Sequence, residues 1–162
     1  MPKIIPLPPQ RSEEARLVIY TVAHWLFHEN ETLEETIAQL RREWPIHDLD
    51  DIQRSYFDNG GTFLAIMEGD EVIGTGALRR LEAGVGEIKR VWLLPQYHGQ
   101  GLGYQMMQRL LDEARHQGYR CVRLCTSPQY QQRAYQFYLR LGFYEIPRYN
   151  DDPDDVSLEL TL

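Results

Sequence analysis

Cysteine is scarce in this chain of 162 residues, and negative charge outweighs positive charge. The two cysteines, Cys121 and Cys125, fall in one predicted strand, where four residues span roughly 13 Å, so they cannot form a disulfide with each other. Their spacing is not that of a zinc site, and we interpret them as core residues. The net charge of −7 argues against broad binding to nucleic acid or to anionic membranes.

Long apolar runs are also missing. No stretch approaches the length of a transmembrane helix, and residues 1–9 lack the apolar region and the cleavage site of a signal peptide. We therefore expect a cytoplasmic protein with no membrane partner. The length, together with 43% hydrophobic and 25% charged residues, suits a single domain over residues 1–162 with a full-sized core.

The chain does contain a glycine-rich turn between an apolar strand and a helix. Residues 87–94 are rich in β-branched and aromatic side chains, which predicts a buried strand that ends at Pro95. Gly99, Gly101 and Gly103 then alternate before apolar residues at helical spacing. The free N–H groups and the positive dipole of a helix N-terminus favour an anion, and glycine lets a phosphate approach closely.

The spacing of this turn excludes two common nucleotide-binding motifs. It is not the P-loop pattern G-x-x-x-x-G-K-[ST], and it lacks the first glycine of the dinucleotide pattern G-x-G-x-x-G. It reads Gln96-x-x-Gly99-x-Gly101-x-Gly103. On this turn alone, a tight structural turn without a ligand remains an alternative.

A second motif occupies residues 131–143 and reads Gln-Gln-Arg-Ala-Tyr-Gln-Phe-Tyr-Leu-Arg-Leu-Gly-Phe. Its apolar side chains recur at helical spacing, and Gly142 supplies a helix stop. Together the two motifs resemble the signatures of the GNAT acetyltransferase superfamily, Q/R-x-x-G-x-G/A and N-x-x-A-x-x-[LFY]-Y-x-x-x-G-F. The resemblance extends from about Gly61 to the C-terminus, and the residues before it match only in a general helical pattern.

The remaining pattern predicts a mixed α/β (α+β) fold. Three successive strands joined by short turns form an antiparallel meander, and a helical crossover makes the following strand parallel to the third. The result is a GNAT-like, mostly antiparallel sheet with one parallel strand pair, flanked by helices. The predicted strands span residues 3–8, 62–67, 72–81, 87–94, 120–125, 143–146 and 156–160, and the predicted helices span residues 12–28, 32–44, 49–57, 101–117 and 131–141.

The resemblance implies an N-acetyltransferase that moves the acetyl group of acetyl-CoA directly to a primary amine within a ternary complex. Neither cysteine has a nearby His/Asp pattern that would support a covalent acyl-enzyme. The alternative is a CoA-binding sensor or interaction module that has lost transfer activity. The acceptor, a small-molecule or peptide amine, is not identified, and the formation of a homodimer is left open.

The resemblance also implies which residues hold acetyl-CoA. The free backbone at the end of strand 87–94 would bind the pantetheine arm like an added strand, and the turn would bind the pyrophosphate. Gln131 replaces the asparagine usual in the family, and His98 stands where an arginine is common. The predicted cofactor-binding residues are Trp92, Leu93, Leu94, Gln96, His98, Gly99, Gln100, Gly101, Leu102, Gly103, Tyr104, Gln131 and Tyr138.

Two residues are candidates for proton transfer. By the resemblance, Tyr138 protonates the CoA thiolate, although its helical spacing alone would place it in the core. Glu87 is the candidate base, because a partly desolvated carboxylate in an apolar strand accepts a proton more readily. The alternatives are a rim glutamate paired with Lys89 or Arg90, and a water relay in place of the carboxylate.

Two further features bear on ligands. No histidine has a companion at metal-ligand spacing, so we expect no metal. The loop of residues 150–155 holds four aspartates, a composition typical of a solvated turn. Alternatively, the loop borders the acceptor pocket, as the resemblance suggests, and its negative field attracts a protonated amine. The four residues are Asp151, Asp152, Asp154 and Asp155.

Overall fold

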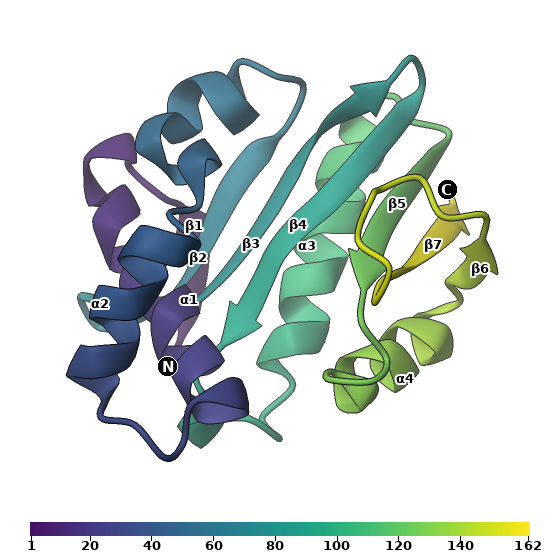
Figure 1. The fold of residues 1–162 in the computed structure, drawn as a ribbon. Coiled ribbons are helices and arrows are strands. Elements are labelled where there is room, and N and C mark those ends of the chain that lie inside the picture. The colour runs from purple at the N-terminus through teal and green to yellow at the C-terminus, as the bar shows by residue number, and fades with distance from the viewer.

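The computed structural model describes residues 1–162, and its strands form one seven-stranded sheet (Figure 1). The order across the sheet is β1-β2-β3-β4-β5-β7-β6, and only β4 and β5 run parallel. The predicted mixed, mostly antiparallel sheet is therefore confirmed. The strands are β1 (Lys3–Pro6), β2 (Thr62–Glu68), β3 (Glu71–Glu82), β4 (Val85–Leu93), β5 (Cys121–Thr126), β6 (Tyr144–Ile146) and β7 (Val156–Thr161).

Helices cover both faces of this sheet. In Figure 1, α1 and α2 lie beside the N-terminal strands, while α3 passes behind β3 and β4. Alternation along β2 divides the core in the same way, because Phe63 and Ala65 pack with α1 whereas Leu64 and Ile66 pack with α3. No helix has the length and apolar character needed to cross a membrane. The helices are α1 (Ser12–Phe27), α2 (Leu33–Glu43), α3 (Leu102–His116) and α4 (Gln132–Leu141), with short 3₁₀ turns η1 (Pro9–Arg11) and η4 (Pro95–Tyr97).

Local sequence signals located several helix ends. Thr32 and Glu35 form a capping box at the start of α2, in which each side chain accepts from the other residue's backbone N–H, at 3.1 and 3.2 Å. Gly118 and Gly142 follow α3 and α4 with φ of +85° and +106°. This left-handed conformation is open to glycine without the strain that a Cβ atom would bring, so both predicted stops are confirmed.

The helix predicted over residues 49–57 forms, but it is not an α-helix. The segment instead forms a 3₁₀ turn, η2 (His47–Asp51), and a π turn, η3 (Gln53–Phe57). The side chains of Asp48 and Tyr56 hydrogen-bond to each other across the two turns. A tertiary contact of this kind outweighs weak local helix propensity.

β4 is distorted by a β-bulge at Arg90. The register with β3 shifts between Thr75, opposite Trp92, and Ala77, opposite Lys89. Arg90 has φ of +57°, which is rare for a residue other than glycine. Its guanidinium is held by the carboxylate of Asp48 through bonds of 2.6 and 3.0 Å. Bulges bend the strand that carries them and increase its twist.

Beyond the start of β4, the two parallel strands separate. β4 and β5 pair only from Val85 opposite Cys121 to Glu87 opposite Arg123. On its other edge β4 stays paired with β3 as far as Leu93. The backbone of residues 88–93 on the β5 side therefore has no partner strand, and a gap opens there between β4 and β5.

Candidate active site

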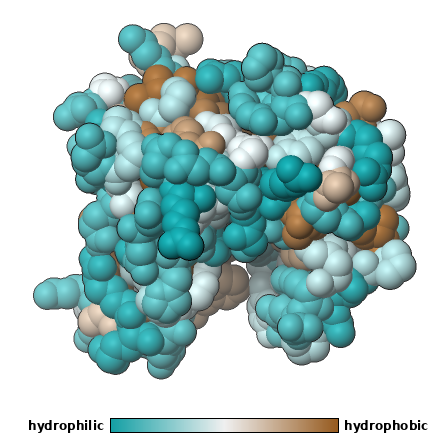
Figure 2. Space-filling model, turned by 90° about the horizontal axis from the view of Figure 1, so that it is seen from above, coloured by the Kyte–Doolittle hydropathy of each residue, from teal (hydrophilic) through white to brown (hydrophobic).

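A cleft of about 840 Å³ opens where β4 and β5 diverge. Its wall is formed by residues of α1, β3, β4, β5, the glycine-rich turn (residues 98–104), α3, α4 and the loop between β6 and β7. Figure 2 looks down on the molecule and shows a notch between two lobes at one edge. Leu94, Gln96 and Gln100 do not line the cleft. The predicted residues that do are Glu87, Trp92, Leu93, His98, Gly99, Gly101, Leu102, Gly103, Tyr104, Gln131 and Tyr138.

The glycine-rich turn presents six consecutive unpaired donors. The backbone N–H groups of residues 99–104 have no acceptor in the chain, and the first bond of α3 runs from the Gln105 N–H to the Gly101 carbonyl at 3.0 Å. A Cβ atom placed on Gly99, Gly101 or Gly103 would meet no atom within 4 Å. The turn therefore borders open space at the positive end of α3, an arrangement suited to a phosphate group.

Side chains beside the turn are tied together. His98 Nε2 lies 3.1 Å from the carbonyl of Leu93, and its Nδ1 lies 3.2 Å from Nη1 of Arg133. Because the arginine can only donate, Nδ1 accepts and Nε2–H donates to the carbonyl. Both ring nitrogens are thus engaged within the chain, and a contact of His98 with the cofactor, which stays a prediction, would require one of them to change partner. The neighbouring cation, Arg133, was not predicted.

Tyr138 is a core residue whose side chain also borders the cleft. Its ring packs against Phe137 and Phe143, with centroids 5.7 and 5.9 Å apart. Burial alone raises the pKa of Tyr138 to about 12, and no hydrogen bond contributes to the shift. The phenol is therefore protonated at neutral pH, and its hydroxyl has no partner within the chain. Packing and a role in proton donation are compatible, because they use different parts of the side chain.

Glu87 is buried, and both of its carboxylate oxygens accept hydrogen bonds. Arg79 contacts Oε1 through Nε at 3.0 Å and through Nη2 at 2.9 Å. The hydroxyl of Tyr149 donates to Oε2 at 2.8 Å. The predicted alternative partners, Lys89 and Arg90, are wrong, because Arg79 lies directly opposite Glu87 in the β3–β4 register.

Tyr149 is a site residue that sequence reasoning missed. It comes from the loop between β6 and β7, which crosses in front of β5 in Figure 1. Its backbone N–H donates to the Ser157 hydroxyl at 3.2 Å, which fixes the residue beside β7. Burial first, then the proximity of Cys125 and Glu87, raises the pKa of Tyr149 well above its usual value. No local pattern marks this tyrosine, because its importance depends on how the loop folds back over the sheet.

The four aspartates of this loop have different environments. Asp155 lines the cleft and accepts a hydrogen bond from the Asn150 amide at 2.8 Å. Burial raises the pKa of Asp155. Asp151, Asp152 and Asp154 are exposed and do not line the cleft. Three of the four therefore behave as a solvated turn, and one borders the pocket.

Both cysteines are free, as predicted. Cys121 is buried, and Sγ of Cys125 lies 3.6 Å from the Ser157 hydroxyl.

Gln131 lies at the start of α4, where its Oε1 is 3.5 Å from the Thr126 hydroxyl. No group of three or more histidine, cysteine or acidic side chains is arranged to hold a metal ion.

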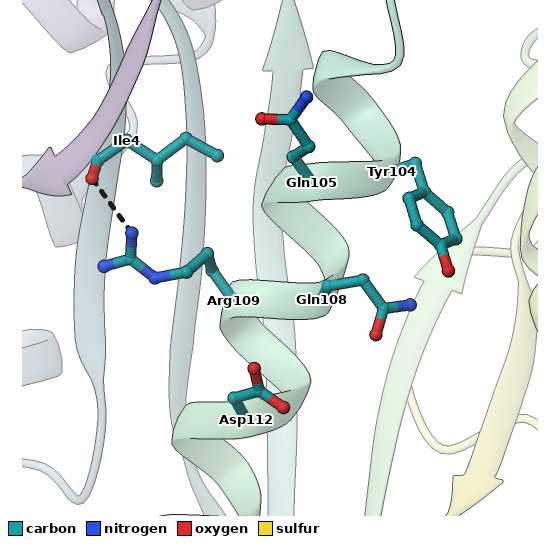
Figure 3. Close-up of a pocket in the computed structure, with 6 residues that line it drawn as sticks. All are labelled: Ile4, Tyr104, Gln105, Gln108, Arg109 and Asp112. Carbon is teal, nitrogen blue, oxygen red and sulfur yellow. Dashed lines mark hydrogen bonds between the residues drawn. The ribbon is translucent and has the colours of Figure 1, made fainter.

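A second, smaller hollow of about 300 Å³ lies on the outer surface of α3. Figure 3 shows its side chains spread along the helix, with Arg109 reaching the carbonyl of Ile4. That bond, at 3.0 Å, ties α3 to β1. The hollow contains neither Glu87 nor Tyr138, so the cleft at the β4–β5 gap is the candidate active site.

The comparisons with known proteins agree with this geometry. Residues 20–143 match the model of the acetyltransferase (GNAT) family. The chain belongs to the GNAT family. It is 32% identical over 105 residues to the uncharacterized N-acetyltransferase YsnE of Bacillus subtilis, a match that covers 62% of this chain and 70% of YsnE. It is 35% identical over 108 residues to rat N-acetyltransferase 8B, where the match covers 63% of this chain and 48% of that protein.

The fold of this GNAT protein also matches solved structures over nearly its whole length. The PaiA N-acetyltransferase of Thermoplasma acidophilum, solved in complex with coenzyme A, superimposes with a TM-score of 0.78 at 20% identity, covering 100% of this chain and 99% of that one. At this identity the likeness shows the fold alone. Membership of this family makes the protein an acetyl-CoA-dependent N-acetyltransferase.

Proposed function

We propose that this GNAT enzyme transfers the acetyl group to a primary amine by direct attack within a ternary complex. The observation that carries the proposal is the run of six unpaired N–H donors at residues 99–104, which opens onto the same cleft as Tyr138 and Glu87. The pyrophosphate of acetyl-CoA would accept from these donors, and Arg133 beside the turn would add positive charge.

The gap between β4 and β5 would receive the pantetheine arm. Its amides would pair with the unpartnered backbone of β4 as an added strand does. The Leu93 carbonyl already accepts from His98, so the pairing would use other groups of residues 91–94. A β4 N–H directed at the thioester would stabilise the developing oxyanion. Gln96, Gln100 and Gln131 stay predicted contacts of the cofactor.

The chemical step joins nitrogen to the acetyl carbon and breaks the carbon–sulfur bond. The departing sulfur would take its proton from Tyr138 as that bond breaks, and the phenol would regain a proton that the attacking nitrogen gives up. Because the pKa of Tyr138 is about 12 and a free thiol has a pKa near 8.5, transfer to a fully formed thiolate would be uphill. The phenol therefore gives its proton to sulfur in concert with cleavage of the carbon–sulfur bond, while it regains one from the nitrogen.

We infer that Glu87 takes up the proton that a protonated amine must lose before it attacks, and that Tyr149 lies between the two groups. Each carboxylate oxygen already accepts hydrogen bonds, Oε1 from Arg79 and Oε2 from Tyr149. The hydroxyl of Tyr149 donates to the carboxylate and can still accept a hydrogen bond from the amine or from a water beside it. The Glu87–Tyr149 pair would thus orient the nucleophile and hold negative charge close to it, which combines the predicted base with the predicted water relay.

The test is release of free thiol from acetyl-CoA in the presence of a panel of primary amines, with the acetylated product identified by mass spectrometry. Direct attack predicts intersecting initial-rate lines when both substrates are varied, and no acetylated protein after incubation with acetyl-CoA alone. Parallel lines with an acetylated cysteine would overturn the ternary mechanism. Tight CoA binding without thiol release for any amine would leave the sensor alternative.

A further inference from the structure

Lys89 is a cation of the cleft wall that has no partner. It lies on β4 between Glu87 and the bulge, is partly buried, and lines the cleft. The two arginines nearest to it in this part of the sheet each have an acidic partner. Arg79 is paired with Glu87, and Arg90 is paired with Asp48. The Lys89 ammonium takes part in no hydrogen bond or ion pair. The chain has one other lysine, Lys3, which is exposed on β1.

The position of Lys89 relative to Glu87 suits a small bifunctional ligand. The two residues are separated by two strand positions, so their side chains leave the same face of the sheet with Cα atoms roughly 7 Å apart. The residue opposite Lys89 is Ala77, which belongs to the core and does not line the cleft, so Lys89 and Glu87 are the members of this row that face the ligand space. The flexible stem of lysine can swing its ammonium toward a group held near Glu87.

The electrostatics of this position favour an anion. Burial lowers the pKa of Lys89, and the charges of Arg90 and Arg79 act in the same direction and outweigh the opposing charges of Glu87 and Asp48. The free ammonium is therefore disfavoured where it stands, and a bound anion would offset both the desolvation and the repulsion. Glu87 and Asp155 also face this cleft, so a ligand with a single negative charge fits better than a phosphate dianion.

We propose that Lys89 binds a carboxylate of the acceptor, so that the substrates are primary amines that also carry a carboxylate, as amino acids do. This inference rests on the proposed function, because it places the amine of the same molecule beside Glu87 and Tyr149. An amino acid holds both groups on one carbon, close enough for one molecule to reach the pair and Lys89. The lysine is thus a residue that determines specificity.

The experiment compares kcat/KM for matched acceptors that differ only in the carboxylate: free amino acids, their amides and the corresponding decarboxylated amines. A second arm uses peptides with an amidated C-terminus that carry either an aspartate or an asparagine next to the N-terminal residue. This comparison shows whether a carboxylate within a peptide is recognised as well as that of a free amino acid. The variants are Lys89→Met, which keeps the stem and removes the charge, and Lys89→Arg, which keeps the charge. Lys3→Met is the matched control.

We expect the wild-type protein to prefer the acid over its amide by at least tenfold, equivalent to about 1.4 kcal/mol. Lys89→Met should abolish the preference, whereas Lys89→Arg should restore most of it and Lys3→Met should leave it intact. Turnover of amides and acids at equal rates by the wild-type protein, or a preference that survives in Lys89→Met, would overturn the inference and leave the proposed function standing. Absence of turnover with every amine would overturn the proposed function itself.

Discussion

Replacing Gly103 with valine should weaken acetyl-CoA binding without harming the fold. Gly103 lies in the first turn of α3 with ordinary helical backbone, and a Cβ atom there would meet nothing within 4 Å. Valine is also a better helix former than glycine. The same change at Gly101 would be a poorer test, because its φ of +79° would strain any side chain. In Gly103→Val the side chain would extend into the open space of the cleft beside the turn, where we expect the phosphate to bind.

The expected increase in the Kd for CoA follows from the N–H donors that border this space. The N–H groups of residues 102–104 have no acceptor in the chain, and a hydrogen bond to a charged group contributes roughly 1.5–3 kcal/mol. Loss of one such bond should raise the Kd for CoA by roughly 10- to 150-fold. The control is Gln105→Val on the same helix, because Gln105 is exposed and lies outside the cleft.

Calorimetry would measure the Kd for CoA in the variant. Kinetics with acetyl-pantetheine would then show whether the loss of binding comes from the pyrophosphate. This shorter thioester has no pyrophosphate, so the kcat/KM for acetyl-pantetheine should change little in Gly103→Val while that for acetyl-CoA falls. Circular dichroism and thermal unfolding would establish that the variant is folded. An unaltered Kd for CoA in a folded variant would refute the assignment of the turn, and an equal loss with both thioesters would place the effect elsewhere in the cleft.

Three further predictions concern other residues. Tyr138→Phe should lower kcat by roughly 100-fold or more with little change in the Kd for acetyl-CoA, as single-turnover kinetics and calorimetry would show; an unaltered chemical step would leave Tyr138 a core residue. Asp155→Asn should lower kcat/KM for protonated amines, most strongly at low salt, whereas exposed Asp151→Asn should not; equal effects on neutral acceptors would contradict steering. Asp48→Asn should destabilise the protein by about 2 kcal/mol at pH 7 in denaturant unfolding, and this difference should shrink as the pH falls from about 4 to 2.

The sign of the last effect follows from the pKa of Asp48. Burial disfavours the carboxylate, but the hydrogen bonds and the charge of Arg90 outweigh this and lower the pKa of Asp48 from 3.8 to about 2. Its contribution to stability is complete above the unfolded-state value and is lost as the pH falls through the folded-state value. A stability difference between wild type and Asp48→Asn that stays constant down to pH 2 would contradict this origin.

Short-range patterns in the sequence were sufficient for most of the architecture. The capping box at Thr32 and Glu35 and the stops at Gly118 and Gly142 each depend on neighbours within one element or at its end. The crossover helix α3 then required β5 to be parallel to β4, as is observed. The helix over residues 49–57 formed as 3₁₀ and π turns, and no local pattern showed that the adjoining Asp48 would bind Arg90, which is distant in sequence.

The sequence by itself determined the order of the elements, the glycine-rich turn and the family resemblance, because each is written in residues that are close together along the chain. Only the tertiary structure decided the partners of the charged groups in the cleft. Register placed Arg79 opposite Glu87, the folding back of a loop brought Tyr149 to the same carboxylate, and pairing of Arg90 with Asp48 left Lys89 without a partner. These pairings join residues far apart in sequence, and their energies depend on burial and distance, which no local pattern specifies.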